Sequence, residues 1–258
     1  MNLFQIFNMK EEEICKEFMS FAKDKGINYE YAPNRYLWIK QNSNVCLTAH
    51  LDTVGYGHTD KEIVDENGLI KAYRNNNRTI LGADDRAGVF IIWELFVNGG
   101  TFDILLFDGE EIGGIGSTNF IETEPDLSNI KLMISLDSPF HNRYIWYGNA
   151  NCYQGLFEYV DSFGFVNDGH GIFTDITILT EYYDIPAINL SVGYRHQHTD
   201  EEYLDVESMY MTMRKLKRML DENKQYSFNK IKPKLEPLDD LEEDWYGRNN
   251  SDTYQTFW

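Results

Sequence analysis

The sequence contains few cysteines, which limits the disulfide bonds and metal sites that it can form. Only three cysteines occur in 258 residues, at Cys15, Cys46 and Cys152, and none forms a CxxC pair. An odd, scattered set argues against a disulfide framework and against a cysteine-rich zinc site. The N-terminal MNLFQIFNMKEEE also lacks the basic region and apolar core of a signal peptide. We therefore expect a reducing, cytoplasmic setting.

Basic residues and long apolar runs are scarce as well. Lysine and arginine number 23 against 42 aspartates and glutamates, a formal net charge of −19. A protein that binds nucleic acid or an anionic membrane needs a basic surface, and the sequence offers only the RKLKR of Arg214–Arg218. No apolar run approaches the roughly 20 residues that cross a bilayer. The composition therefore predicts neither a nucleic-acid nor a membrane partner, and it suits a globular protein that holds multivalent cations.

The sequence does contain a regular alternation of strand and helix patterns. Apolar residues at helical spacing predict helices, and nearly continuous apolar runs predict interior strands. The alternation indicates an α/β fold, a three-layer sandwich with a mostly parallel central sheet flanked by helices. The predicted order is helix 9–25, strands 36–40 and 44–49, helix 84–98, strand 101–107, helix 115–122, strand 130–137, helix 175–183, strand 186–192 and helix 206–223.

Residues 1–224 are predicted to form a single catalytic domain, and residues 225–258 a tail. The tail has prolines, an acidic run and no periodicity, which is typical of an extended or disordered segment. As an alternative, its aromatic residues pack on the domain or engage a partner. These aromatic residues are Trp245, Tyr246, Tyr254, Phe257 and Trp258.

Imidazole and carboxylate side chains occur where the predicted strands end. In an open α/β sheet the carboxyl ends of parallel strands meet at one edge, and ligands bind there. Each residue alone could be a helix cap, a core histidine or a turn former, but their coincidence at one edge indicates a site. They are His50 and Asp52 after strand 44–49, Asp84 and Asp85 at the start of helix 84–98, Glu110 and Glu111 after strand 101–107, Asp137 at the end of strand 130–137, and His196 and His198 after strand 186–192.

Nitrogen and oxygen donors without sulfur suit Zn²⁺, with Mn²⁺ and Co²⁺ as alternatives. Even two histidines and three carboxylates from this set are too many for one tetrahedral ion that keeps a water. They suffice for two ions if one carboxylate bridges them. Two metals about 3.5–4 Å apart can hold a bridging hydroxide and polarise a carbonyl together.

Five segments in this order resemble the motifs of the dinuclear zinc exopeptidases: TAHLDTV, LGADDRAG, FDGEEIGGIGS, SLDSP and HTDEE. That clan includes the single-domain leucyl-type aminopeptidases, peptidase T, glutamate carboxypeptidases and acetylornithine deacetylase. The resemblance spans residues 44–220. It implies the compact, single-domain form, because 34 residues separate His50 from Asp84 and 61 separate Asp137 from His198. Neither interval leaves room for the domain that other members insert there.

The resemblance also implies a role for each polar residue of the motifs. A cis peptide often follows the family's bridging aspartate, so Asp84–Asp85 is expected to be cis. His198 precedes a threonine as the family's last histidine usually does, and His196 is the alternative. Tyr147 and Tyr194 would lie near the site and help to hold an oxyanion. The implied roles are His50 and Asp137 as ligands of one metal, Glu111 and His198 as ligands of the other, Asp84 as the bridge, Asp52 as the residue that orients His50, and Glu110 as the general base.

The first functional hypothesis is a metal-dependent aminopeptidase that acts on a peptide or a small amino-acid amide. Glu110 would take a proton from the attacking water and deliver it to the leaving amine. A related amidohydrolase, either a deacylase or a carboxypeptidase for small acylated amino acids, would use the same metals. It would need a basic side chain for the substrate carboxylate, and Arg143 and Arg195 are the nearby candidates. A third reading is a non-catalytic binding module that acts through the aromatic tail.

Overall fold

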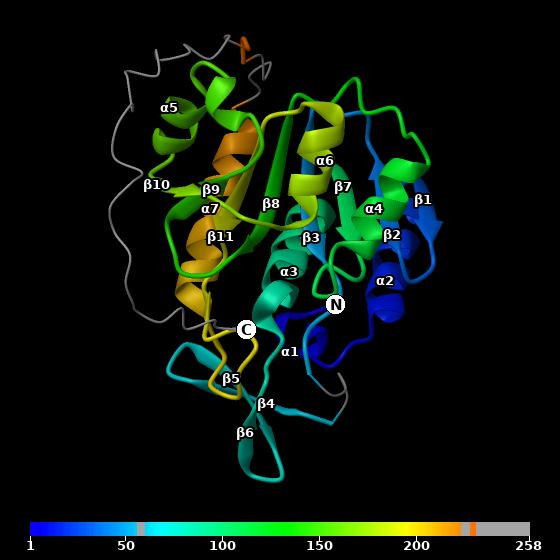
Figure 1. Ribbon diagram of the computed structural model, residues 1–258. Helices are drawn as coiled ribbons and strands as arrows, with labels where there is room; N and C mark the ends of the chain where they lie inside the picture. Colours follow the sequence, from blue (N-terminus) through cyan, green and yellow to red (C-terminus); the bar gives the residue numbers. More distant parts are fainter. Residues whose placement is uncertain (56–59, 223–227, 231–258) are drawn as a thin grey trace, which may run out of the picture.

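An eight-stranded sheet runs through the middle of the molecule (Figure 1). The computed structural model of the chain describes residues 1–55, 60–222 and 228–230. In the sheet β7, β3, β8 and β11 are parallel neighbours, while β2 and β9 join them in antiparallel pairs. The order across the sheet is β1 (Asn28–Ala32), β2 (Tyr36–Lys40), β7 (Asp103–Phe107), β3 (Val45–His50), β8 (Leu132–Ser138), β11 (Ala187–Ser191), β9 (Arg143–Trp146) and β10 (Val166–His170).

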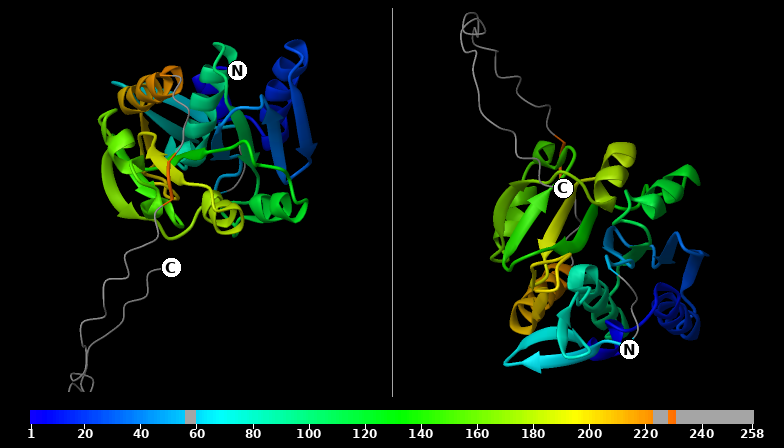
Figure 2. Two further views of the ribbon diagram at one scale, coloured as in Figure 1. Left: turned by 90° about the horizontal axis from the view of Figure 1, so that it is seen from above. Right: turned by 60° about the horizontal axis from the view of Figure 1, so that its bottom comes forward.

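Helices cover both faces of this sheet, as Figure 2 shows. One face carries α2 (Glu11–Asp24), α3 (Ala83–Val97) and α7 (Val206–Asp221), and the other carries α4 (Ile115–Glu122) and α6 (Asp175–Tyr183). The short helices α1 (Leu3–Ile6) and α5 (Leu156–Asp161) and a 3₁₀ turn at Ala150–Cys152 complete the described helical segments. The predicted three-layer α/β fold is confirmed.

The strands of the central sheet contribute side chains to two separate apolar cores, because successive side chains point to opposite faces of the sheet. In β7, Ile104 and Leu106 pack with α2, α3 and α7, whereas Leu105 and Phe107 pack with α4 and α6. Every residue of β3, β7 and β11 is buried, as expected for strands covered on both sides.

A second, antiparallel sheet lies at the bottom of Figure 1. Most of it comes from the segment between His50 and Asp84, where the sequence analysis had placed no strands. Its hairpin turns, at Asn67-Gly68 and Asn75-Asn76, have positive φ at both central residues. Asn-Gly, as at Asn67-Gly68, is a sequence signal for a tight hairpin turn. The strands are β4 (Glu62–Glu66), β5 (Leu69–Arg74), β6 (Asn77–Thr79), β12 (Tyr194–Arg195) and β13 (Tyr203–Asp205).

Every predicted helix and strand is present, with ends within two residues of the prediction. The missed helices have six residues or fewer, and the missed strands lie toward the ends of the central sheet or in the second sheet. Within the described residues, no helix combines the length and the apolarity that a membrane span needs.

Of the predicted tail, only Phe228–Lys230 lies within the described residues, so the tail prediction is otherwise outside them. This short stretch contacts the domain. Phe228 packs against the larger core, and Lys230 pairs with Asp184 and forms a β-bridge with Tyr153.

Candidate metal centre

The polar residues predicted to form a site lie together at the carboxyl ends of β3, β7 and β8. His50 is the last residue of β3, and it lies opposite Phe107, the last residue of β7. This register brings the Glu110-Glu111 pair, which follows β7, beside the histidine. Asp137 lies near the end of β8, on the other side of β3.

Two groups of ligand atoms share Asp84. His50, Asp84 and Asp137 offer atoms within 4.8 Å of one another, and so do Asp84, Glu111 and His198. Asp84 Oδ1 lies 3.0 Å from His50 Nε2, and Asp84 Oδ2 lies 3.1 Å from His198 Nε2. A carboxylate whose two oxygens face two different histidines has the arrangement that a bridging ligand needs.

In each group, the second carboxylate also lies close to the histidine. Glu111 Oε1 lies 2.9 Å from His198 Nε2, and Asp137 Oδ1 lies 3.6 Å from His50 Nε2. His196 lies apart from both groups, and its ring contacts Tyr203 instead. The structure thus brings together His50, Asp84, Glu111, Asp137 and His198.

The charges of this cluster require positive charge between the carboxylates. Hydrogen bonds to Asp84 and Glu111 raise the pKa of His198 to about 10. Burial alone would lower the pKa of His50, but hydrogen bonds to Asp137 and neighbouring carboxylates outweigh it and raise that pKa well above its usual value. In the metal-free chain, protonated imidazoles would offset part of the negative charge of the carboxylates. Divalent cations would displace these protons, so the donor set fits a pair of such ions.

The chain around Asp84 is shaped by its neighbours. The Asp84–Asp85 peptide is cis, as the resemblance implied. The buried Asp85 carboxylate accepts hydrogen bonds from His50 N (3.2 Å) and Gly88 N (3.0 Å), which ties the end of β3 to the first turn of α3. A Cβ at Gly88 would lie 2.0 Å from Leu136 O, so only glycine permits α3 to lie this close to β8. The roles of Asp85 and Gly88 were not predicted.

Asp52 connects the first histidine with the paired glutamates. Its carboxylate accepts a hydrogen bond from Glu110 N and another from Glu111 N, both at 3.1 Å. His50 Nδ1 lies 2.9 Å from the Asp52 carbonyl oxygen and 3.5 Å from its carboxylate. The closer contact that orients the His50 ring is therefore the main-chain carbonyl, while the carboxylate holds the glutamate backbone.

Glu110 is half-buried beside the cluster. Its carboxylate, His50 and Glu111 offer atoms within 4.8 Å of one another. Burial raises the pKa of Glu110 to about 9 in the metal-free chain, with Asp137 among the carboxylates that add to the shift. Nearby cations would lower this pKa, because they favour the ionised form.

Asp137 is held by residues that the sequence analysis did not identify. Thr174 Oγ1 donates to its Oδ2 at 3.0 Å, and the Asn189 side chain bonds to its backbone N–H and carbonyl at 2.8 and 2.7 Å. Tyr194, expected to help an oxyanion, donates its hydroxyl to Asp137 Oδ1 at 3.3 Å. Tyr147 is buried, and burial raises its pKa to about 12.

Exposed apolar side chains border the cluster. Ile112, which follows Glu111, is 72% exposed, and Phe173, which precedes Thr174, is 45% exposed. The two loops touch, since a Cβ at Gly114 would lie 3.1 Å from Phe173 Cζ. An apolar rim beside a polar cluster is typical of a site that receives apolar groups.

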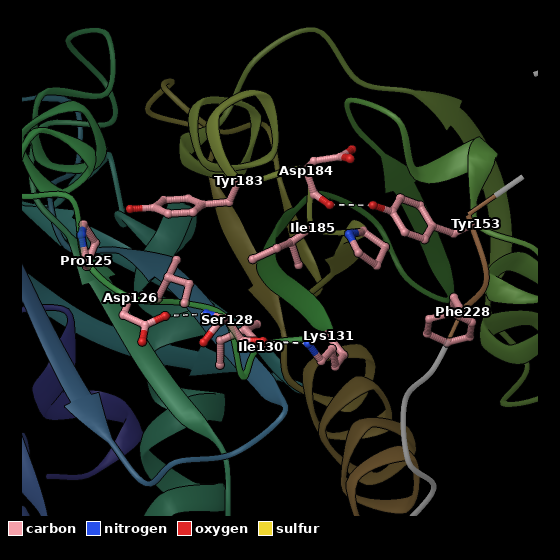
Figure 3. Close-up of a pocket in the computed structure, with 12 residues that line it drawn as sticks. Pro125, Asp126, Ser128, Ile130, Lys131, Tyr153, Tyr183, Asp184, Ile185 and Phe228 are labelled. Atoms are coloured by element: carbon pink, nitrogen blue, oxygen red, sulfur yellow. Dashed lines mark hydrogen bonds between the residues drawn. The ribbon is translucent and has the colours of Figure 1, made fainter. Parts of the chain in front are cut away.

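A cavity of about 450 Å³ lies at the opposite edge of the sheet (Figure 3). Its walls come from the segments that precede β8 and β11, including Lys131, Tyr183 and Asp184, and from Tyr153 and Phe228. Because the amino ends of these parallel strands point away from the metal ligands, this cavity is separate from the candidate metal centre.

The fold and this cluster define a hydrolase of the metallopeptidase class. The chain belongs to peptidase family M28, because residues 34–205, most of its length, match the model of that family.

A curated relative is the uncharacterized protein YqjE of Bacillus subtilis (strain 168). It is 38% identical over 127 residues, which are 42% of this chain and 33% of that protein, so the match spans about a third of the relative's length.

Two solved structures share the fold. Aminopeptidase PepT from Bacillus cereus ATCC 10987 matches with a TM-score of 0.68 and 16% identity, over 85% of this chain and 96% of that chain. A tripeptidase from Staphylococcus aureus subsp. aureus mu50 matches with a TM-score of 0.67 and 13% identity, over the same shares. At these identities the likeness establishes the fold alone.

Proposed function

We propose that this protein is an aminopeptidase that uses two divalent metal ions, zinc by preference and Mn²⁺ or Co²⁺ as alternatives. The observation that carries the proposal is the position of Asp84, whose two oxygens face His50 and His198 at 3.0 and 3.1 Å. His50 and Asp137 would hold one ion together with Asp84, and Glu111 and His198 the other.

The residues divide the work of peptide hydrolysis. When bound, the ion pair supplies Lewis-acid polarisation of the scissile carbonyl and makes the attacking water more acidic. Glu110 lies next to the ligands without belonging to either group that shares Asp84. It takes the proton from the attacking water and then delivers it to the leaving amine. Asp52 keeps Glu110 and Glu111 in place through their backbone N–H groups.

The electrostatics around the site support recognition of a free amino terminus. The chain carries a net charge of −19, and carboxylates dominate the site, which favours a cationic α-amine over an anionic substrate end. Arg143, one of two candidates for binding a substrate carboxylate, donates to both oxygens of Asp168 at 3.1 and 2.9 Å. The names of the two solved relatives, an aminopeptidase and a tripeptidase, agree with a peptide substrate.

One observation favours a second candidate, a deacylase or carboxypeptidase for small acylated amino acids. Arg195 stacks on Phe140, with 4.3 Å from its guanidinium carbon to the ring centroid, and contacts His141. Within the part of the chain that the structure describes, it contacts no carboxylate. It is therefore available to an anionic substrate group. Membership of a peptidase family speaks against the non-catalytic binding module.

We also propose a cellular compartment for the protein and the kinds of partner that it lacks. All three cysteines are free and buried, which supports a reducing cytoplasm. The acidic charge supports a protein without nucleic-acid or membrane partners. A partner or self-contact of the aromatic tail concerns residues beyond those described.

A metal-titrated activity screen tests the proposal. The metal-depleted chain is assayed with Zn²⁺, Mn²⁺ or Co²⁺ on aminoacyl-arylamides and, in parallel, on N-acyl amino acids. Cleavage of the arylamides with two ions bound per chain is the expected result. Release of acyl groups with arylamides left intact would replace the proposal by the second candidate.

A further inference from the structure

A buried carboxylate beside the metal ligands has no part in the reaction proposed above. Glu202 is the last residue of the HTDEE segment and is 0% exposed. The side chain of the adjacent Glu201 is 73% exposed and lies 3.7 Å from Arg78. Burying an ionisable group is costly unless it is hydrogen-bonded, so the contacts of Glu202 indicate its purpose.

Glu202 binds the backbone of the segment that delivers Asp84. Its Oε2 accepts a hydrogen bond from Gly82 N at 2.7 Å, and its Oε1 accepts one from Asp84 N at 3.1 Å. The chain is left-handed at Gly82 (φ 72°) and non-helical at Asp84, so the regular bonds of α3 do not determine its course there. Burial raises the pKa of this carboxylate to about 7, although the hydrogen bonds from the backbone N–H groups of Asp84 and Gly82 favour its charged form.

Glu202 is itself fixed on the segment that delivers His198. Its backbone N–H donates to Thr199 O at 3.1 Å, and Arg78 Nη2 donates to its carbonyl oxygen at 2.8 Å. The Asp84 segment is held from a second side, because Lys61 Nζ donates to Leu81 O at 2.9 Å. Glu202 therefore links the two segments whose side chains meet at 3.1 Å between Asp84 and His198.

We propose that Glu202 is a positioning residue of the metal centre, which holds the backbone of Asp84 against the His198 segment so that the bridging carboxylate is in place before metal binds. This inference rests on the metal centre of the proposed function. Since both ions would share Asp84, loss of Glu202 should weaken both metal-binding steps. Loss of an outer ligand such as Glu111 should weaken mainly one step.

The variant Glu202→Gln isolates this contact. The amide keeps one acceptor oxygen and the shape of the side chain, but it turns an N–H₂ group toward a backbone N–H that then lacks an acceptor. Removing a group that holds a ligand typically costs about 10- to 100-fold in metal affinity. Glu201→Gln is the matched control, because it makes the same chemical change at the adjacent, exposed position.

The full-length variants are depleted of metal, checked for folding by circular dichroism, and titrated with Zn²⁺ against a chromophoric chelator. Glu202→Gln is expected to weaken both steps by about 10-fold or more. Glu201→Gln should stay within about twofold of the parent chain, and Glu202→Asp, which withdraws the carboxylate by one methylene, should fall between. Zinc should also raise the melting temperature of Glu202→Gln less than that of the parent.

A folded Glu202→Gln chain with both affinities unchanged would overturn the inference. If this variant does not fold, Glu202→Asp decides in the same way. If neither folds, Glu202 is a folding determinant and the inference is also wrong. The readout is separate from catalysis: a parent chain that binds two zinc ions but cleaves no substrate contradicts the proposed reaction and leaves the role of Glu202 intact.

Discussion

The adjacent residues Glu110 and Glu111 should respond differently to substitution. Both backbone N–H groups bind Asp52 at 3.1 Å, so changing either side chain leaves the backbone anchored. Glu111 Oε1 lies 2.9 Å from His198 Nε2 within a group that includes Asp84, whereas Glu110 belongs to neither group that shares Asp84. Glu110→Gln should therefore keep metal and lose turnover, and Glu111→Ala should lose metal affinity.

The size of the Glu110 effect follows from its role as a general base. Such a group contributes about 100- to 10,000-fold to the rate. This corresponds to about 3–5 kcal/mol in the activation barrier, at about 1.4 kcal/mol per factor of ten. Glutamine has nearly the same shape but does not accept the proton, so kcat should fall by that factor while the metal content stays at the level of the parent chain.

The assay combines arylamide hydrolysis with metal analysis of the same samples. Excess Zn²⁺ should restore part of the activity of Glu111→Ala, because its defect is in binding, and should not restore Glu110→Gln. The division of roles would be refuted if both variants lost metal equally, or if Glu110→Gln kept its turnover within about tenfold of the parent, less than a general base contributes.

Three further outcomes are expected. Phe120 is fully buried, and its ring lies edge-on to the rings of Tyr36 and Trp38, with centroids 5.0 and 5.4 Å away. Phe120→Ala should therefore lower the free energy of unfolding, measured in urea, by about 3–5 kcal/mol. A decrease of under 1 kcal/mol would contradict this packing. In the metal-free chain the pKa of His198 is raised to about 10, from about 6.5 when unfolded, so its stabilisation is complete below pH 6.5 and is lost as pH rises toward 10. Urea titrations with chelator should show this slope, and His198→Ala should make it shallower, while His50 and Glu110, whose pKa values are also raised, keep the remainder. Phe173→Ser should raise KM about tenfold for substrates with a large apolar first side chain and leave KM for alanyl substrates near the parent value. Equal effects on both kinds of substrate would show that Phe173 does not contribute to recognition of the first side chain.

Much of the fold and of the site could be predicted because the signals are local. Helix and strand periodicity is visible in windows of a few turns, and the carboxyl ends of parallel strands must share an edge. His50, Glu111 and Asp137 are therefore expected at one edge, and the neighbouring positions of β7, β3 and β8 bring them together. The resemblance to exopeptidase motifs then distinguished His198 from His196, and the structure places His198 beside Asp84.

The residues that hold the ligands could not be predicted in the same way. Asn189 binds the backbone of Asp137 across 52 positions, and Glu202 binds Asp84 N across 118 positions. Such contacts depend on how whole segments pack. Glu202 lies in the HTDEE segment, but the resemblance implied no role for it, and Asn189 is a single polar residue within a predicted apolar strand. The hairpin between His50 and Asp84 was missed for another reason, since its strands are largely half-exposed and carry no apolar run.

The β5–β6 hairpin of the second sheet bears on how such an enzyme can diversify. The turn at Asn75-Asn76 is exposed at the far end of the second sheet, while the base of the same sheet includes β12 and β13 on either side of His198. Exposed turns are the places where a chain accepts extra segments. A domain inserted at Asn75-Asn76 would extend away from the metal ligands, and the sheet would still connect it to the segment that carries His198. The same position would therefore serve to add an assembly contact without changing the residues of the site.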